Sequence, residues 1–219
     1  MQLLSEILLC PVGALVLVLL IPARAVQAIR WVCALSALVA GVLSAQLWRT
    51  YDAAAGGFQF VEIIPWVEEV GISYHLAVDG FSTILVMLTS IVFFTGVLTM
   101  WDLEIRVKEF FAFMLLLVTG VYGVFLSQDL FFFFLFYELA IVPMYLLIAV
   151  WGSSTRFTDF NRPKEYGALK LVMMIVAGSL LIWVAIIAIY VEAEEGSFNI
   201  LRLQGAAEIG KFSDTFQSV

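Results

Sequence analysis

Stretches of roughly 20 mostly apolar residues follow one another along this chain and limit what it can fold into. Hydrophobic residues make up 63% of the 219 residues, whereas a soluble domain is about half apolar. Backbone polar groups cannot stay unpaired in lipid, so apolar runs of this length form helices. The sequence therefore predicts an all-α, polytopic transmembrane helix bundle with about six spanning helices, at residues 3–21, 27–48, 80–101, 110–128, 130–151 and 168–191.

Charge and cysteine content exclude several other classes of protein. The chain carries 11 Lys and Arg against 18 Asp and Glu, and this acidic balance argues against nucleic acid as a partner. Cys10 and Cys33 lie inside apolar runs and form no C-x-x-C motif. His75 is the only histidine, and we expect it at the membrane interface. The sequence therefore predicts neither a metal site nor a bound cofactor in this chain.

The charges of the connections predict the orientation in the membrane. Basic residues gather in the first, third and fifth connections: Arg24, Arg106, Lys108, Arg156, Arg162 and Lys164. Acidic residues dominate the other connections: Asp52, Glu62, Glu68, Glu69, Asp129, Glu192, Glu194 and Glu195. Because basic connections favour the cytoplasmic side, we expect the N-terminus and the non-membrane tail, residues 192–219, on the opposite side.

Small residues at a regular spacing predict close packing between helices. Ser36, Ala40 and Ser44 follow one another at intervals of four, and Thr119 and Gly123 repeat this spacing in the fourth span. Small residues at this spacing let helices approach closely, although they are also common in membrane helices in general.

The connection of residues 50–79 is the longest inside the chain and contains interfacial aromatic residues. At its end, Asp79 is placed to cap the third span.

Glu138 is the main candidate for function, because it lies near the middle of the fifth span. A charge at that depth costs about 2.5–3.5 kcal/mol on insertion scales, and burial disfavours the charged form of a carboxyl group. Such an acid is suited to take up and release a proton. The alternative is a structural glutamate that is hydrogen-bonded to a neighbouring helix.

Pro143 and the phenylalanines beside Glu138 strengthen the functional interpretation. Pro143 has no N–H, so the carbonyl of Leu139 loses its helical donor. A freed carbonyl and a kink next to a buried acid predict a place that water can enter. The phenylalanines of residues 131–136 are expected to exclude bulk water on the other side.

Lys170 is the second candidate, one turn into the sixth span. Two interpretations remain open for it. The side chain extends to the interface, which needs no function, or it faces inward and modulates the buried acid electrostatically.

Several motifs resemble a known family. The run FYELAIVPMYLLI at residues 136–148, YHLAVDGFS at 74–82, KEYGALK at 164–170 and AGSLL at 177–181 are similar to subunit M, the mitochondrial subunit 4 type, of proton-pumping NADH:quinone oxidoreductase (respiratory complex I). This subunit is related to Mrp antiporters, and the likeness covers nearly the whole chain.

The resemblance implies a function as a membrane-arm subunit of this translocase in an energy-transducing membrane, with the bacterial inner membrane expected. Glu138 matches the glutamate that pairs with a lysine of the seventh helix and carries the proton. Quinone reduction, flavin and iron–sulfur clusters belong to partner subunits, and no redox chemistry is expected in this chain.

The family's seventh-helix lysine and its second repeat are not found in this sequence. We therefore expect either a separate chain with the C-terminal half or a truncated polypeptide. Two other functions fit the same residues: a subunit of an Mrp-type cation/proton antiporter or membrane-bound hydrogenase, or a structural half-subunit without transport of its own.

Overall fold

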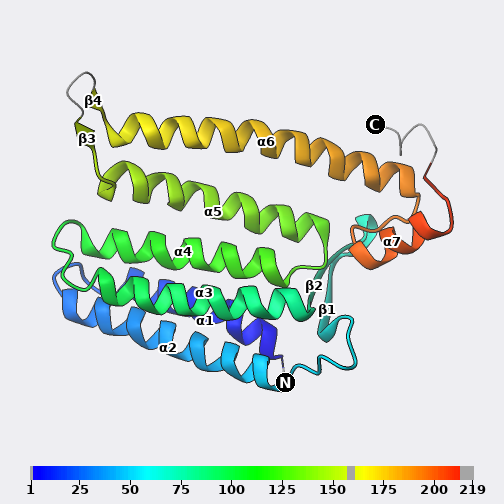
Figure 1. Ribbon diagram of the computed structural model, residues 1–219, viewed down its shortest axis with the longest axis horizontal. Coiled ribbons are helices and arrows are strands. Elements are labelled where there is room, and N and C mark those ends of the chain that lie inside the picture. Colours follow the sequence, from blue (N-terminus) through cyan, green and yellow to red (C-terminus); the bar gives the residue numbers. More distant parts are fainter. Residues whose placement is uncertain (1, 157–160, 213–219) are drawn as a thin grey trace.

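The computed structural model describes residues 2–156 and 161–212 and consists mainly of long helices (Figure 1). Within this part, six helices are long and apolar enough to cross a membrane. They are α1 (Leu3–Leu20), α2 (Val26–Thr50), α3 (Gly80–Thr99), α4 (Val107–Leu126), α5 (Leu130–Trp151) and α6 (Lys164–Ala193). The predicted all-α transmembrane fold is confirmed. The largest difference in bounds is at the start of α6, which begins at Lys164 rather than at residue 168.

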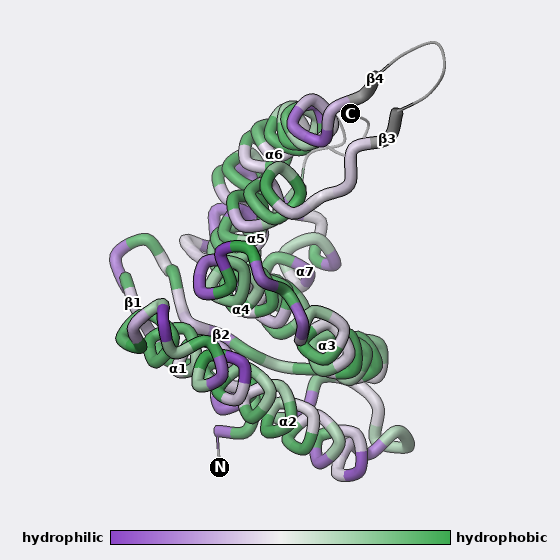
Figure 2. The backbone as a smooth tube through the Cα atoms, turned by 90° about the vertical axis from the view of Figure 1, so that its left-hand side faces the viewer, coloured by the Kyte–Doolittle hydropathy of each residue, from purple (hydrophilic) through white to green (hydrophobic). Residues whose placement is uncertain are grey.

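The helices form a four-helix bundle with a projecting helical pair. Helices α1 to α4 all pack against one another except α1 and α3, whereas α5 packs against α4 on one side and against α6 on the other. Figure 2 shows this arrangement end on, with α5 and α6 continuing outward from α4 of the bundle and apolar residues along the helix flanks. The helix contacts that the small residues predict are present: Ser36, Ala40 and Ser44 of α2 are all buried.

The connection before α3 folds into a β-hairpin, which the sequence did not predict. Strands β1 (Gln59–Val67) and β2 (Ile72–Val78) pair antiparallel, with the short 3₁₀ turn η1 (Glu68–Val70) between them. Gly71 closes the turn with φ +68°, a conformation that glycine adopts without strain. There is also no room for a side chain at this position, because a Cβ would lie 1.8 Å from the carbonyl oxygen of Gly196.

Glu62 of β1 attaches this hairpin to the first helix. Its carboxylate accepts hydrogen bonds from the N–H groups of Leu4 at 3.0 Å and Ser5 at 3.1 Å. These donors belong to the first turn of α1, where N–H groups have no partner inside the helix and a negative charge is favourable. Sequence analysis treated Glu62 only as part of an acidic connection, because a cap that comes from a distant strand leaves no local pattern.

The short helix α7 (Ile200–Glu208) lies at the same end of the molecule as the hairpin (Figure 1). Asn199 caps it and accepts hydrogen bonds from the N–H groups of Leu201 and Arg202. Leu203 and Ala206 of α7 pack against Ala193 at the end of α6. Two short strands, β3 (Thr155–Arg156) and β4 (Asn161–Arg162), connect α5 to α6 at the opposite end.

Candidate functional site

The depth of Glu138 in the membrane depends on where α5 begins, directly after Asp129. Asp129 is fully buried, and its carboxylate accepts hydrogen bonds from the N–H groups of Phe131 at 3.0 Å and Phe132 at 3.3 Å. It also accepts one from the N–H of Ser73 in β2 at 3.0 Å. Burial raises the pKa of Asp129, and these N–H donors oppose that shift. Glu138 is nine residues further on, which places it about 14 Å into a hydrocarbon layer of about 30 Å.

Helix α5 approaches α4 closely at two glycines. A Cβ on Gly123 would lie 2.1 Å from the ring of Phe136, and one on Gly120 would lie 2.9 Å from the Cβ of Ala140. The predicted role of Gly123 in close packing is therefore confirmed, and Thr119 beside it is buried. This contact directs the face with Phe136 and Ala140 toward α4 and leaves another face of α5 for α6.

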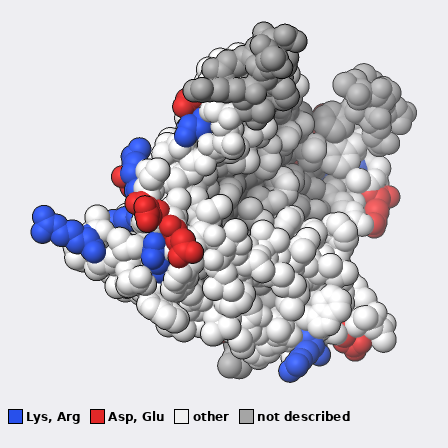
Figure 3. All heavy atoms as spheres, turned by 60° about the vertical axis from the view of Figure 1, so that its left-hand side comes forward, with Lys and Arg blue, Asp and Glu red and all other residues white. Residues whose placement is uncertain are grey.

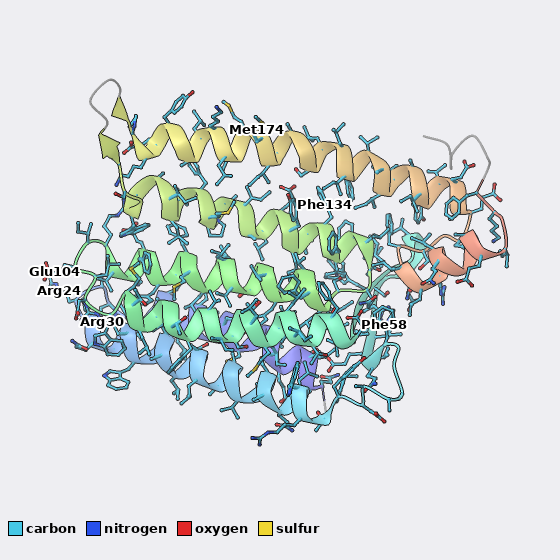
Figure 4. The ribbon with its side chains drawn as sticks, in the orientation of Figure 1. Arg24, Arg30, Phe58, Glu104, Phe134 and Met174 are labelled. Carbon is cyan, nitrogen blue, oxygen red and sulfur yellow. The ribbon has the colours of Figure 1, made fainter. Side chains whose placement is uncertain are left out.

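The face of α5 that carries Glu138 looks toward α6. The ring of Phe134 stacks on Trp183 of α6 with centroids 4.8 Å apart. Figure 4 shows Phe134 between the two helices and Met174 on the outer side of α6. Glu138 follows Phe134 by four residues, so both side chains lie on one face of the helix.

Glu138 has an unsatisfied carboxylate oxygen in this position. The residue is half-buried, and within the described part of the chain its Oε1 is fully buried without a hydrogen-bond partner. An unsatisfied buried polar group costs about 1–3 kcal/mol. Such groups are rare in native structures, and each one needs a physical explanation, such as a catalytic role or a bound water or ion.

Pro143 and the aromatic run lie on either side of this acid along α5. Pro143 is buried, and α5 continues as one helix from Leu130 to Trp151. The predicted loss of a donor for the Leu139 carbonyl follows from its ring, whereas the helix shows no break there. On the other side, Phe131 and Phe132 contact Trp66 of the hairpin, with ring centroids 6.1 and 5.4 Å apart. Aromatic side chains therefore fill the space between Glu138 and the hairpin end.

Lys170 is not brought into contact with Glu138. It is exposed and lines a cavity of about 370 Å³ together with Ile148, Lys164 and Tyr166. Ile148 lies ten residues beyond Glu138, so Lys170 is displaced by about 15 Å along the helix axis. Any electrostatic effect of Lys170 on the acid acts over this distance. Asp79, in contrast, caps α3 as predicted and accepts a hydrogen bond from the N–H of Ser82 at 2.7 Å.

Basic side chains at the β3–β4 end have structural roles at helix termini. Lys108 donates hydrogen bonds to the carbonyls of Leu19 and Ile21, each at 2.8 Å, and Lys164 donates to the carbonyl of Val150. Cations at helix C-termini are favourable. Figure 3 shows Lys, Arg, Asp and Glu side chains around the rim of this end, with a largely uncharged face between them. The side chains of Arg156 and Arg162 lie outside the described part.

His75 belongs to a polar cluster that sequence analysis missed. It lies in β2 and is buried, with 1% exposure. Its Nδ1 lies 2.8 Å from the Nδ2 of Asn199, and its carbonyl accepts a hydrogen bond from the N–H of Gln128. Burial lowers the pKa of His75, and the charge of Asp129 opposes this shift. The partners are 53 and 124 residues away in sequence, so no local pattern predicts them.

The fold described above is that of an antiporter-like membrane domain. Residues 127–216 match a family described as "NADH:quinone oxidoreductase/Mrp antiporter, TM".

Relatives of this chain include chain 4 of NAD(P)H-quinone oxidoreductase. The protein of Thermosynechococcus vestitus is 35% identical over 91% of this chain and 36% of its own length. The chloroplastic protein of Chara vulgaris is 38% identical over 83% of this chain and 36% of its own length. The chain thus spans little more than a third of the length of these relatives.

Solved structures have the same fold. A chain of respiratory complex I from Thermus thermophilus matches with a TM-score of 0.76 at 22% identity, over 94% of this chain and 39% of that one. A chain of the Mrp complex from Dietzia matches with a TM-score of 0.68 at 18% identity, over 91% of this chain and 20% of that one. Within the described residues, no three His, Cys, Asp or Glu side chains are grouped as metal ligands.

Proposed function

We propose that this chain is a membrane-arm subunit of a respiratory NADH:quinone oxidoreductase and takes part in proton translocation coupled to quinone reduction. Glu138 is the acid that takes up and releases the proton. The observation that carries the proposal is the buried, unpartnered Oε1 of Glu138 near the middle of a spanning helix. An ionisable group is retained at that depth, in spite of its cost, where it serves transport.

Proton transfer at this position needs a partner group from outside the described residues. Helices α5 and α6 are the least covered of the six described spans. In their most apolar 18-residue stretches, only 17% and 11% of the residues are buried. Because a carboxylate is costly against lipid, a further spanning helix with a lysine covers Glu138 in our proposal. Other membrane-arm subunits surround the chain, and those that reduce quinone carry the flavin and iron–sulfur clusters.

The orientation that we propose places the β3–β4 end on the cytoplasmic side and the hairpin with α7 on the other. Charge supports it, because Arg24, Arg106, Lys108 and Lys164 lie on or beside the connections of the first end. The bacterial inner membrane is the proposed location.

The decisive experiment replaces Glu138 in the assembled complex and measures protons pumped per electron pair transferred to quinone. Glu138→Gln keeps the size and polarity of the side chain but removes its proton exchange, so pumping should fall severalfold. Glu165→Gln, at the exposed start of α6, is the matched control and should pump normally. Normal coupled pumping by Glu138→Gln would contradict the proposed function.

A second candidate function is a subunit of an Mrp-type cation/proton antiporter. It is favoured by the fold that this chain shares with the Mrp complex of Dietzia. The subunits that purify with the chain separate the two functions. Flavin and iron–sulfur subunits support the oxidoreductase, whereas cation/proton antiport without redox subunits supports the antiporter.

A further inference from the structure

One buried face of α6 carries a polar residue that the proposed function does not use. The buried residues of this helix are Ala168, Ser179, Ile186 and Ala193, and Ser179 is the polar one among them, with 2% exposure. Apart from α7, which packs near Ala193, the helix that covers α6 is α5. The burial of Ser179 is therefore caused by α5.

Ring and cavity contacts establish the register between the two antiparallel helices. Phe134 stacks on Trp183 at 4.8 Å, and further along, Ile141 of α5 and Ile175 of α6 line one cavity. Between these two levels, Glu138 lies four residues after Phe134. Four residues before Trp183 on α6 is Ser179. Both steps move about 6 Å in the same direction, so Glu138 and Ser179 lie at one level.

The two residues also lie on facing sides of their helices. A step of four residues in an α-helix returns to the same face. Glu138 therefore shares the face of Phe134, and Ser179 shares the face of Trp183, and these two faces are in contact through their rings. Figure 4 agrees with this arrangement, since Met174 projects from the opposite side of α6 and is 68% exposed.

The chemistry of the serine hydroxyl suits an acid that changes its charge. Ser179 Oγ donates a hydrogen bond to the carbonyl of Val176 at 3.1 Å, which leaves its lone pairs free to accept. A protonated carboxyl group needs an acceptor for its O–H, whereas a carboxylate needs a donor. A hydroxyl that rotates meets both needs without a rearrangement of the helices.

We propose that Ser179 is a positioning residue for Glu138. In the part of the chain that the structure describes, Oε1 of Glu138 has no partner and Ser179 donates to Val176. In the proposed contact, the O–H of neutral Glu138 turns to donate to Ser179 Oγ, while the serine keeps its hydrogen bond to Val176. After the proton has left, the serine hydroxyl turns away from Val176 and donates to the carboxylate. The inference deepens the proposed function, since it concerns the same acid, but the contact between the two side chains is testable independently of pumping.

Infrared spectroscopy of the full chain in lipid tests this contact directly. The C=O stretching band of protonated Glu138 is identified, in a series from acidic to alkaline pH, as the band that Glu138→Gln removes. Loss of a hydrogen bond moves such a band to higher wavenumber. Ser179→Ala should therefore shift the band upward, and Ser179→Thr, which keeps a hydroxyl, should return it toward its original position.

Gly178→Ala is the matched control, because a Cβ at that position has no neighbour within 4 Å. It adds a methyl group to the adjacent residue of α6 and should leave the band in place. A band that does not move in Ser179→Ala overturns the inference, even where Glu138→Gln abolishes pumping. A band that moves while Glu138→Gln pumps normally supports the Ser179 contact and contradicts the proposed function instead.

Discussion

The bundle of α1 to α4 and the pair of α5 and α6 satisfy their polar groups differently. In the bundle, Ser90 lies 2.6 Å from the hydroxyl of Ser44 and 2.7 Å from that of Tyr122, so three buried hydroxyls from three helices are partners of one another. In the pair, Oε1 of Glu138 is buried without a partner among the described residues. In the most apolar 18-residue stretch of each helix, 50% of the residues of α4 are buried, against 11% of those of α6.

This difference indicates that the bundle of α1 to α4 provides stability, whereas the pair of α5 and α6 carries the candidate functional site. Close packing and hydrogen bonds between its helices make the bundle a scaffold that depends little on other subunits. The pair keeps an ionisable group and an uncovered face, which is the state of a site that is completed from outside. The two regions meet at the α4–α5 contact and at the start of α5, so changes at these places test the distinction.

The largest effect is expected at the contact between α4 and α5. Gly123→Ala places a methyl group 2.1 Å from the ring of Phe136, which is held between the two helices. Overpacking of this kind costs about 3 kcal/mol. The pair should separate from the bundle before the bundle unfolds, because the three atoms nearest to the new methyl group all belong to Phe136 of α5. Denaturant unfolding in detergent, followed by tryptophan fluorescence, measures the loss.

Gly41→Ala provides the control for this change. It makes the same substitution on α2, where a Cβ has no neighbour within 4 Å. Its unfolding curve should match that of the unaltered chain. Equal stabilities for the two alanine variants would show that α4 and α5 do not need the close approach.

A smaller effect is expected from the two aspartates that cap helices. The side chain of Asp129 accepts hydrogen bonds from the N–H groups of Phe131, Phe132 and Ser73. The side chain of Asp79 accepts one from the N–H group of Ser82. Asp129→Ala should cost roughly 2 kcal/mol and Asp79→Ala about 1 kcal/mol. Asp129→Asn should retain most of the stability, since an amide oxygen still accepts. Thermal unfolding ranks the three variants, and equal losses for both alanine variants would contradict the role of Asp129 in joining the hairpin to α5.

The sequence predicts those features that depend on local pattern. Apolar runs locate the spans, and the cap of α3 by Asp79 follows from a polar residue directly before an apolar run. The cost of a charge in lipid selects Glu138 without any knowledge of its neighbours. These inferences are reliable because each rests on one segment of chain and on the membrane as a uniform solvent.

Features that depend on distant segments were missed. The hairpin needs Gly71 to approach Gly196, and its anchoring needs Glu62 to reach the start of α1. His75 appeared to be a single interfacial residue because its partner Asn199 follows four intervening helices. Ser179 was only part of the AGSLL run at residues 177–181 until the stacking of Phe134 on Trp183 established the register of the pair.

The smallest expected effect concerns the connection between His75 and α7. Oδ1 of Asn199 accepts from the N–H groups of Leu201 and Arg202, so its Nδ2 is the group that donates to His75 Nδ1. His75 is therefore neutral, with its proton on Nε2. Protonation at Nδ1 would set two donors against each other and cost about one hydrogen bond, ~1 kcal/mol.

The sign of the pH dependence follows from the lowered pKa of His75. Burial lowers it below the ordinary value of 6.5, so the stabilising effect is present above pH 6.5 and is lost as pH falls below that value toward the native pKa. Asp129, which faces His75, has a raised pKa and contributes with the opposite sign, because the folded state favours its proton. A variant that removes only the histidine is therefore needed to isolate the effect.

Hydrogen exchange at the N–H of Ile200 reports this connection, since that group donates to the carbonyl of Gln128 at 3.0 Å. After correction for the intrinsic effect of pH on exchange, its protection should fall as the pH is lowered below 6.5, the ordinary pKa of the histidine. His75→Gln does not titrate in this range and should show nearly constant protection. Amides in the middle of α4 should be unaffected in both proteins, because the bundle does not depend on α7. Protection that falls equally in His75→Gln would show that His75 is not the source of the pH dependence and has a purely structural role.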